Sequence, residues 1–386
     1  MTMPSTTMTR RAALGTTLAA VAGCATSSAS GSDSLDALAR AKGLRFGSAL
    51  GIRHRDTTQA FGFDDPNYRA LVARECGLIV PENELKWQAL RPGPGKFSFE
   101  SADQLLAWAT SQNLGMRGHT LLWHAAKWLP EWVNRHDFGT QPKQEAERLL
   151  TEHISTVCRH YGTAIASWDV VNESVDPDTG ALRDNAFTPH LGNVGQIELA
   201  FRVAHEHAPH AQLVYNDFMG AGSYSTKHRA SVLKLLQDLK ARGAPVMALG
   251  LQSHLGTGED GRWVARGSAH EQEWRRFLDE VSGMGLDILI TELDVNDRYL
   301  PADVAKRDAD AAAMVREFLD VTLAQPRLRT VMAWGLADPY SWMLTWWPRA
   351  DGLPKRPCPY DRELKAKPMR DAIAAALRAA PARGAA

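Results

Sequence analysis

From about residue 35 onward, short apolar runs typical of buried strands alternate with longer segments whose apolar residues recur every three or four positions. The clearest of these amphipathic helical patterns consists of Val194, Ile197, Phe201, Ala204 and Ala208. The apolar runs predict eight strands, over residues 45–50, 78–80, 115–122, 165–171, 212–216, 246–251, 287–291 and 330–334. Because a helical segment follows each run, the strands are expected to be parallel and covered by helices. Eight is the number that closes a (β/α)8 TIM barrel, so we predict one such domain.

The first 34 residues have a different pattern. Arg10 and Arg11 precede an uncharged apolar run over residues 12–23, which is too short to span a bilayer but fits the core of an export signal. The paired arginines resemble a twin-arginine signal, although Ala13 stands where that motif usually has Phe. Residues 21–24 (Val-Ala-Gly-Cys) resemble a lipobox; the alternative is ordinary cleavage after residues 20–22.

We therefore predict an export signal and short tether over residues 1–34 and the barrel domain over residues 35–386. Export would make the protein periplasmic, secreted or lipid-anchored at Cys24. No later stretch approaches eighteen apolar residues, so we expect no membrane span.

Composition narrows the possible partners and cofactors. Lys plus Arg and Asp plus Glu both number 44, which gives no electrostatic reason to expect binding to nucleic acid or an anionic membrane. His205 and His207 are two residues apart on a predicted helix and do not share a face, and the cysteines lack C-x-x-C spacing. No Gly-rich phosphate loop follows a strand. We expect no metal and no cofactor, and a monomer.

Residues that can bind sugars or transfer protons gather where the predicted strands end. Seven of the eight strands run into such segments, at residues 82–87, 118–124, 168–173, 215–217, 250–254, 290–294 and 333–335. In a barrel of this kind the active site lies at the C-terminal ends of the strands. Carboxylates, imidazoles and indoles in this concentration exceed what a structural barrel mouth needs, so these segments are the predicted active site.

Six of these segments resemble motifs of glycoside hydrolase family 10, the retaining endo-1,4-β-xylanases. They are E-N-x-x-K-W at 82–87, G-H-T-L-x-W-H at 118–124, W-D-V-V-N-E at 168–173, Q-S-H at 252–254, T-E-L-D at 291–294 and W-G…D…S-W at 334–342. The resemblance runs from about Leu44 to Ala380. It implies that the barrel is a catalytic domain that hydrolyses internal β-1,4 bonds of xylan and xylo-oligosaccharides.

Cleavage of a glycosidic bond needs one carboxyl group to protonate the leaving oxygen and a second to meet the anomeric carbon. Glu173 and Glu292, at the ends of the fourth and seventh predicted strands, are the candidates. By resemblance, Glu173 is the acid/base and Glu292 the nucleophile. The two groups must start in different protonation states, so their surroundings must hold their pKa values apart.

The resemblance also implies partners for the two glutamates. Gln252 is expected to bind Glu173, and His254 to bind Glu292. Asp294 would support His254 by holding its imidazole in the useful tautomer. Asn172 would meet the 2-hydroxyl of the reacting sugar, a contact that strengthens in the transition state.

The remaining matches fit a polysaccharide groove. The resemblance implies a hydrogen-bonding wall for the non-reducing side of the substrate, made of Glu82, Asn83, Lys86 and His119. It also implies three indoles around the reacting sugar, those of Trp123, Trp334 and Trp342, of which one near the last strand leaves no room for a C6 hydroxymethyl group. Lys86 could instead form an internal ion pair with Glu82. Core packing is the alternative for every tryptophan, and it is our interpretation for Trp87, Trp108 and Trp168.

Two segments depart from the family pattern. After His124 the family usually has Ser-Gln-x-Pro-x-Trp, whereas residues 125–132 read Ala-Ala-Lys-Trp-Leu-Pro-Glu-Trp. The substrate-binding Gln is therefore absent and the loop is about two residues longer. Met343 stands where an Arg commonly follows the Trp of S-W. Neither change touches the two carboxylates. Because of both changes, the affinity and length of the sugar sites on the non-reducing side are not predicted.

Two alternative functions stay open. A barrel hydrolase could use the same two glutamates on another β-linked glycan, such as cellulose or mannan. A sugar-binding protein could keep the groove without the chemistry, although that usually shows as a replaced catalytic carboxylate, and both are present here.

Overall fold

The computed structural model describes residues 1–2, 33–52, 62–256 and 267–384. Arg10, Arg11 and Cys24, on which the export prediction depends, lie outside the described residues. The chain divides into two units, residues 1–33 and 34–386, and the second contains all the elements described below.

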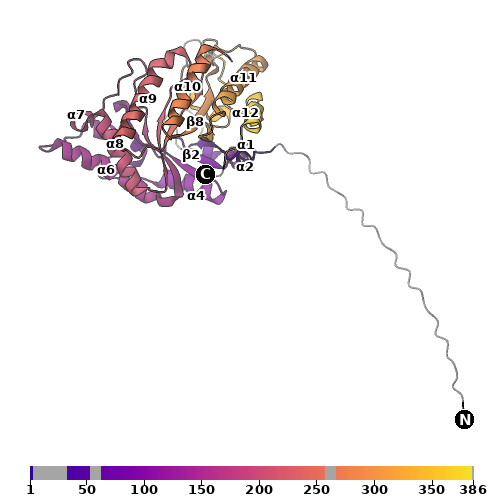
Figure 1. Ribbon diagram of the computed structural model, residues 1–386, viewed down its shortest axis with the longest axis horizontal. Helices are drawn as coiled ribbons and strands as arrows, with labels where there is room; N and C mark the ends of the chain where they lie inside the picture. The colour runs from indigo at the N-terminus through magenta and orange to yellow at the C-terminus, as the bar shows by residue number, and fades with distance from the viewer. Residues whose placement is uncertain (3–32, 53–61, 257–266, 385–386) are drawn as a thin grey trace. The chain divides into compact units, whose positions relative to one another are not determined.

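Residues 34–386 form a barrel of parallel strands (Figure 1). The strands are β1 Arg45–Leu50, β2 Leu78–Pro81, β3 Gly115–Trp123, β4 Ile165–Asn172, β5 Gln212–Asp217, β6 Ala248–Leu251, β7 His254–Leu255, β8 Asp287–Val295 and β9 Leu328–Ala333. Pairing runs in order from β1 to β6, then from β6 to β8, β9 and back to β1, which closes eight strands. The eight predicted strands are confirmed, and β7 is an additional two-residue strand paired with the end of β8.

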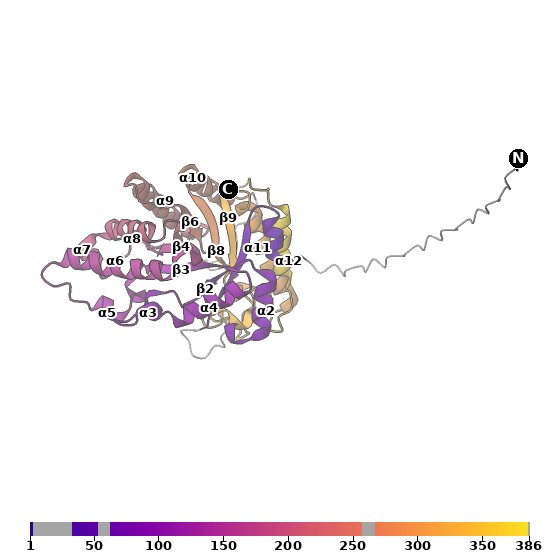
Figure 2. The same ribbon diagram turned by 90° about the horizontal axis from the view of Figure 1, so that it is seen from below.

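Helices surround the strands, and Figure 2 shows α6, α8, α9 and α11 outside them. The helices are α1 Leu35–Arg40, α2 Pro66–Glu75, α3 Trp87–Leu90, α4 Glu100–Ser111, α5 Glu131–Asn134, α6 Pro142–Tyr161, α7 Thr188–Leu191, α8 Asn193–His207, α9 Thr226–Ala241, α10 Ala269–Gly283, α11 Val304–Thr322 and α12 Pro368–Ala379. In α8 the predicted apolar stripe is buried at Ile197, Phe201 and Ala204. No helix in the described ranges is both long enough and apolar enough to cross a membrane.

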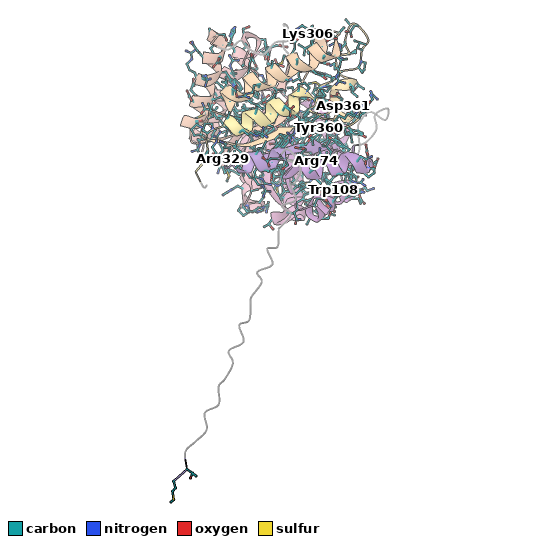
Figure 3. All side chains as sticks on the ribbon, turned by 90° about the vertical axis from the view of Figure 1, so that its right-hand side faces the viewer. Arg74, Trp108, Lys306, Arg329, Tyr360 and Asp361 are labelled. Carbon is teal, nitrogen blue, oxygen red and sulfur yellow. The ribbon has the colours of Figure 1, made fainter. Side chains whose placement is uncertain are left out.

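One buried carboxylate ties the first and last parts of the barrel together. Glu75, at the end of α2, accepts hydrogen bonds from the backbone N–H of Leu35 (3.0 Å), the hydroxyl of Tyr360 (2.8 Å) and Arg370 of α12 (3.2 Å). Arg74 and Tyr360 lie near each other on the face seen in Figure 3. Because both its oxygens are satisfied, Glu75 can be buried at 3% exposure.

A glycine in β3 makes room for a buried tryptophan side chain of β4. Gly118 stands opposite Trp168 in the register of β3 and β4, and Trp168 is fully buried. A Cβ atom at Gly118 would lie 2.0 Å from the indole of Trp168. The glycine is therefore required for the buried tryptophan to fit.

We predict that Gly118→Ala destabilises the barrel, because the added methyl group must displace the Trp168 ring from a close-packed core. Overpacking of this kind costs about 1–3 kcal/mol of unfolding free energy. The matched control is Gly115→Ala in the same strand, where a Cβ atom would meet nothing closer than 3.6 Å. Denaturant unfolding of both variants measures the difference; equal stabilities would contradict the prediction.

Candidate active site

The predicted site residues come together at the C-terminal ends of the strands. Glu82 and Asn83 follow β2, and Lys86 lies just before α3; His119 and Trp123 belong to β3, and Asn172 and Glu173 end β4. On the far side of the barrel mouth, Gln252 follows β6, His254 begins β7, Glu292 and Asp294 lie in β8, and Trp334 and Trp342 follow β9. The arrangement is that of a barrel enzyme, in which several strands each contribute one or two functional side chains.

Buried amides link Glu173 to Glu292. Gln252 Nε2 donates to Glu173 Oε1 (2.9 Å) and to Asn172 Oδ1 (3.2 Å). Asn216 Nδ2 donates to the same Asn172 oxygen (3.0 Å) and to Glu292 Oε1 (2.8 Å). Because two amide N–H groups converge on one atom of Asn172, that atom is its carbonyl oxygen. The two carboxyl groups are thus held by one continuous network.

The structure adds Asn216 and Asp217, at the end of β5, to the residues that the motifs indicated. Asn216 stands opposite Asn172 in the strand register, and Thr291 Oγ1 donates to its side-chain oxygen (2.7 Å). Asp217 is fully buried, accepts a hydrogen bond from the Tyr215 hydroxyl (2.5 Å) and lies 3.1 Å from His228 Nε2. Their polar character at the end of an apolar strand is the only sequence signal for them.

The surroundings of Glu173 favour its protonated form. Burial raises the pKa of this carboxyl group, and the negative charges of Asp217 and Glu292 act in the same direction. Hydrogen bonds from Gln252 and from Trp123 Nε1 (3.0 Å) oppose the rise but do not cancel it. Glu173 also has a backbone φ of +56°, a conformation that non-glycine residues seldom adopt outside functional sites.

The surroundings of Glu292 favour its ionised form. Burial alone would raise the pKa of Glu292, but the hydrogen bond from His254, attraction to His119 and His254, and the Asn216 amide lower it overall. His254 Nε2 lies 3.3 Å from Glu292 Oε2. The two glutamates therefore have pKa values displaced in opposite directions, as an acid and a nucleophile require.

The surroundings of His254 favour its charged form. Its Nδ1 lies 2.7 Å from Asp294 Oδ1, while Trp342 Nε1 donates to the other Asp294 oxygen (2.8 Å). Burial would lower the pKa of His254, but Asp294 and Glu292 on either side raise it to about 10. Asp294 thus lies against the imidazole, as the sequence analysis expected, and a protonated His254 would direct one N–H at each carboxylate.

Of the predicted hydrogen-bonding wall, Glu82, Lys86 and His119 are buried and Asn83 is half-buried. Lys86 Nζ donates to Asn83 Oδ1 (3.0 Å) and lies 4.8 Å from the centre of the Trp123 ring. Burial lowers the pKa of Lys86. The negative charges of nearby carboxylates, that of Glu82 most of all, act in the opposite direction but do not cancel the effect. His119 Nδ1 lies 3.0 Å from Asp169 Oδ2, a buried carboxylate that also accepts from Arg117 (2.6 Å).

The tryptophans divide between core and site largely as predicted. Trp87 and Trp168 are buried in the core, and the half-buried Trp108 packs against it. Trp334 is only 7% exposed and meets His119 edge-on, with ring centres 5.4 Å apart. Trp334 belongs to a small buried apolar cluster with Ala49, Leu78, Val80 and Met332, and Trp342 packs against this cluster.

Both segments that depart from the family pattern place a second indole against a site indole. In the longer loop after β3, Trp128 of η2 (Ala126–Trp128) stacks on Trp123 with ring centres 4.2 Å apart and 18° between the planes. After β9, Trp346 stacks on Trp342, with ring centres 4.7 Å apart. Met343 is fully buried, so an apolar side chain fits where the family commonly has Arg.

No group of three or more His, Cys, Asp or Glu side chains within the described parts of the chain is placed to hold a metal ion. The chemistry that these residues offer is proton transfer and nucleophilic attack by carboxyl groups. A (β/α)8 barrel with two hydrogen-bonded glutamates whose pKa values are displaced in opposite directions, flanked by indoles, defines a glycoside hydrolase.

Comparison with known proteins gives the family. The family model described as glycosyl hydrolase family 10 matches residues 34–376, so the chain belongs to glycoside hydrolase family 10. The chain is 32% identical to the "Endo-1,4-beta-xylanase A" of Fusarium oxysporum f. sp. lycopersici over 311 residues, which cover 80% of this chain and 89% of that protein.

A solved structure and a much longer relative are also similar to this chain. The crystal structure of xylanase 10B from Thermotoga petrophila in complex with xylobiose matches with a TM-score of 0.76 and 28% identity, covering 89% of this chain and 97% of that chain. This similarity confirms the predicted barrel. The "Exoglucanase XynX" of Acetivibrio thermocellus is 30% identical over 331 residues; these cover 82% of this chain, which spans 28% of that protein's length.

The opposite displacement of the two pKa values can be tested without substrate. We predict that Asp217→Asn lowers the pKa of Glu173, because it removes a negative charge that disfavours ionisation. Glu292→Gln should act in the same direction. The pKa is read from the carboxyl carbon of Glu173 in a 13C NMR titration, with the exposed Asp178→Asn as the control. An unchanged or higher pKa in Asp217→Asn would contradict this electrostatic account.

Proposed function

We propose that the protein is a retaining endo-1,4-β-xylanase, which hydrolyses internal β-1,4-xylosidic bonds of xylan by double displacement. The observation that carries this proposal is the pair of linked glutamates whose pKa values are displaced in opposite directions. The names of the Fusarium relative and of the Thermotoga petrophila structure, which contains xylobiose, support the substrate.

In the first step, the carboxylate of Glu292 attacks the anomeric carbon while Glu173 transfers its proton to the leaving oxygen. This breaks the glycosidic bond and leaves a xylosyl ester on Glu292. In the second step, Glu173 takes a proton from water, whose oxygen attacks the anomeric carbon and releases Glu292 as a carboxylate. Both carboxyl groups return to their starting protonation states.

The same network explains how Glu173 can act first as an acid and then as a base. The negative charge of Glu292 is one cause of the raised pKa of Glu173. Esterification of Glu292 removes that charge, so the pKa of Glu173 falls in the covalent intermediate. Glu173 is then ionised when a base is needed. The His254 imidazolium and the Asn216 amide keep Glu292 ionised before the attack.

The sugar-binding roles follow the motif matches. Asn172 binds the 2-hydroxyl of the reacting xylose, and Trp123, Trp334 and Trp342 enclose its ring. Glu82, Asn83, Lys86 and His119 bind the next xylose on the non-reducing side. Trp334 belongs to a small buried apolar cluster against which Trp342 packs. By the family resemblance, a tryptophan near the last strand crowds the space that a C6 hydroxymethyl group would need, which favours xylose over glucose.

We also propose that residues 1–34 direct export through a twin-arginine-type signal, with the barrel as the catalytic domain. The basis is the sequence pattern around Arg10 and Arg11. Lipid attachment at Cys24 and ordinary cleavage remain the two alternatives for the processed N-terminus, and the mature enzyme is proposed to act as a monomer.

The substrate is tested by comparing initial rates on linear xylan, carboxymethylcellulose and mannan. We expect xylan to be hydrolysed fastest, with internal cleavage and with the β-anomer of the product formed first, as seen by proton NMR. A preference for carboxymethylcellulose would favour a β-glucanase, in line with the name of the Acetivibrio relative. Initial formation of the α-anomer would overturn the retaining mechanism.

The roles of the two glutamates are tested by azide rescue with an aryl β-xylobioside. In Glu173→Ala the activated phenolate leaves without a proton, so the xylobiosyl-enzyme forms but accumulates. Azide attacks this intermediate without a base and should give a β-glycosyl azide. In Glu292→Ala no covalent intermediate forms, and any azide product should be the α-anomer. A β-azide from Glu292→Ala with an α-azide from Glu173→Ala would show that the roles are reversed.

A further inference from the structure

Two exposed aromatic rings stand beside the active site and take no part in the proposed reaction. Trp347, in the segment after β9, is 45% exposed, and Tyr299, in η5 (Asp297–Tyr299), is 52% exposed. Within the described ranges they are two of three exposed aromatic side chains. Both follow strands at their C-terminal ends, so they lie on the same end of the barrel as the two glutamates.

A guanidinium group lies against both rings. The Cζ atom of Arg298 is 5.4 Å from the centre of the Tyr299 ring and 5.8 Å from that of Trp347. Among the described residues Arg298 has no carboxylate within ion-pair distance. Neighbouring arginines differ: Arg349 pairs with Asp351 and Arg356 with Asp308. Arg298 is therefore a cation with its planar donor fork available, placed between two apolar ring surfaces.

The two loops that carry these residues are held together. Arg349 donates to the backbone oxygens of Asp297 and Leu300 (2.9 Å for the latter), and the backbone N–H of Arg356 donates to Asp297 Oδ2 (3.0 Å). The relative positions of Arg298 and Trp347 are therefore set before any ligand binds, which reduces the entropy lost on binding.

Stacked rings connect this surface to the active site. Trp347 stacks on Trp346 with ring centres 4.4 Å apart and 15° between the planes. Trp346 stacks in turn on Trp342, whose indole donates to Asp294. The exposed surface is thus continuous with the indole that covers the reacting sugar, although it lies outside the carboxylate pair.

We propose that Arg298, Tyr299 and Trp347 form a binding site for an acidic substituent of the polysaccharide, a uronic acid attached to the xylan backbone near the cleavage point. The carboxylate of the uronic acid pairs with the Arg298 fork, and the C–H face of its ring packs on the adjacent aromatic rings. A neutral side group would lack the charged contact. This inference rests on the proposed function, because the substituent is carried by the xylan chain.

The test compares kcat/KM on two substrates with the same backbone length, a linear xylo-oligosaccharide and one carrying a single uronic acid. For wild-type protein we expect the acidic substrate to be preferred, and the preference to fall as salt is added. Arg298→Gln should lose about tenfold in kcat/KM on the acidic substrate, the size expected for one charge-assisted contact. Its kcat/KM on the linear substrate should be unchanged. Trp347→Ala should likewise lose kcat/KM on the acidic substrate and keep it on the linear one.

Arg329 provides a matched control, because it lies near the start of β9 at the opposite end of the barrel (Figure 3). Arg329→Gln should leave both substrates unaffected. Equal losses by Arg298→Gln on the two substrates, or no loss on either, would overturn the proposal. Arg298→Lys should restore part of the preference, since it keeps the charge without the fork.

Failure of the proposed function would give a different result. Wild-type protein would then hydrolyse neither oligosaccharide, and the site would be tested by calorimetric titration with a disaccharide of xylose and uronic acid. Binding by wild-type protein that is lost in Arg298→Gln would support the acidic-sugar site on its own. Absent binding, or equal binding by both proteins, would reject the site.

Discussion

Glu292 is buried and Glu173 is half-buried in one network, and partial removal from water makes the ionised form of either carboxyl group costly. Two negative charges side by side would raise that cost further, so the site must neutralise one group and stabilise the charge on the other. It does so with unequal neighbours. Glu292 faces the His254 imidazolium, whereas Glu173 lies in the field of Asp217. The other residues of the barrel mouth hold the two glutamates in these different electrostatic surroundings.

The support comes from the sheet itself. Asn172 and Asn216 are opposite each other in neighbouring parallel strands, so the register that closes the barrel also brings their amides together. Gln252, from just beyond the next strand, completes the connection to Glu173. Side chains anchored at strand ends have little freedom to move, and a network made of them fixes the carboxyl groups more accurately than loop residues would.

The sequence predicted the barrel well because apolar strand runs and amphipathic helices have different periods. The two-residue strand β7 escaped because it is too short to form a pattern. Residues 215–217 were placed in the predicted site, but the role of Asn216 as the link between Asn172 and Glu292 was not predicted, because an asparagine at a strand end has many ordinary explanations. The raised pKa of His254 could not be predicted, since it depends on Glu292 and Asp294 together. The stacking of Trp128 on Trp123 was also beyond sequence spacing, because loop geometry brings the two rings into contact.

The position of Glu75 has a consequence for biosynthesis. Its carboxylate lies in the first quarter of the chain, yet the Tyr360 and Arg370 side chains that satisfy it are among the last to leave the ribosome. Until then Glu75 has only Arg74 and the backbone N–H of Leu35 as partners, so closing the barrel would leave its buried charge incompletely paired, which is destabilising. The nascent chain therefore cannot reach its final packing while synthesis continues. A ribosome that stops before residue 360 releases a chain that can still pair β1 with β9 but leaves Glu75 without two of its partners.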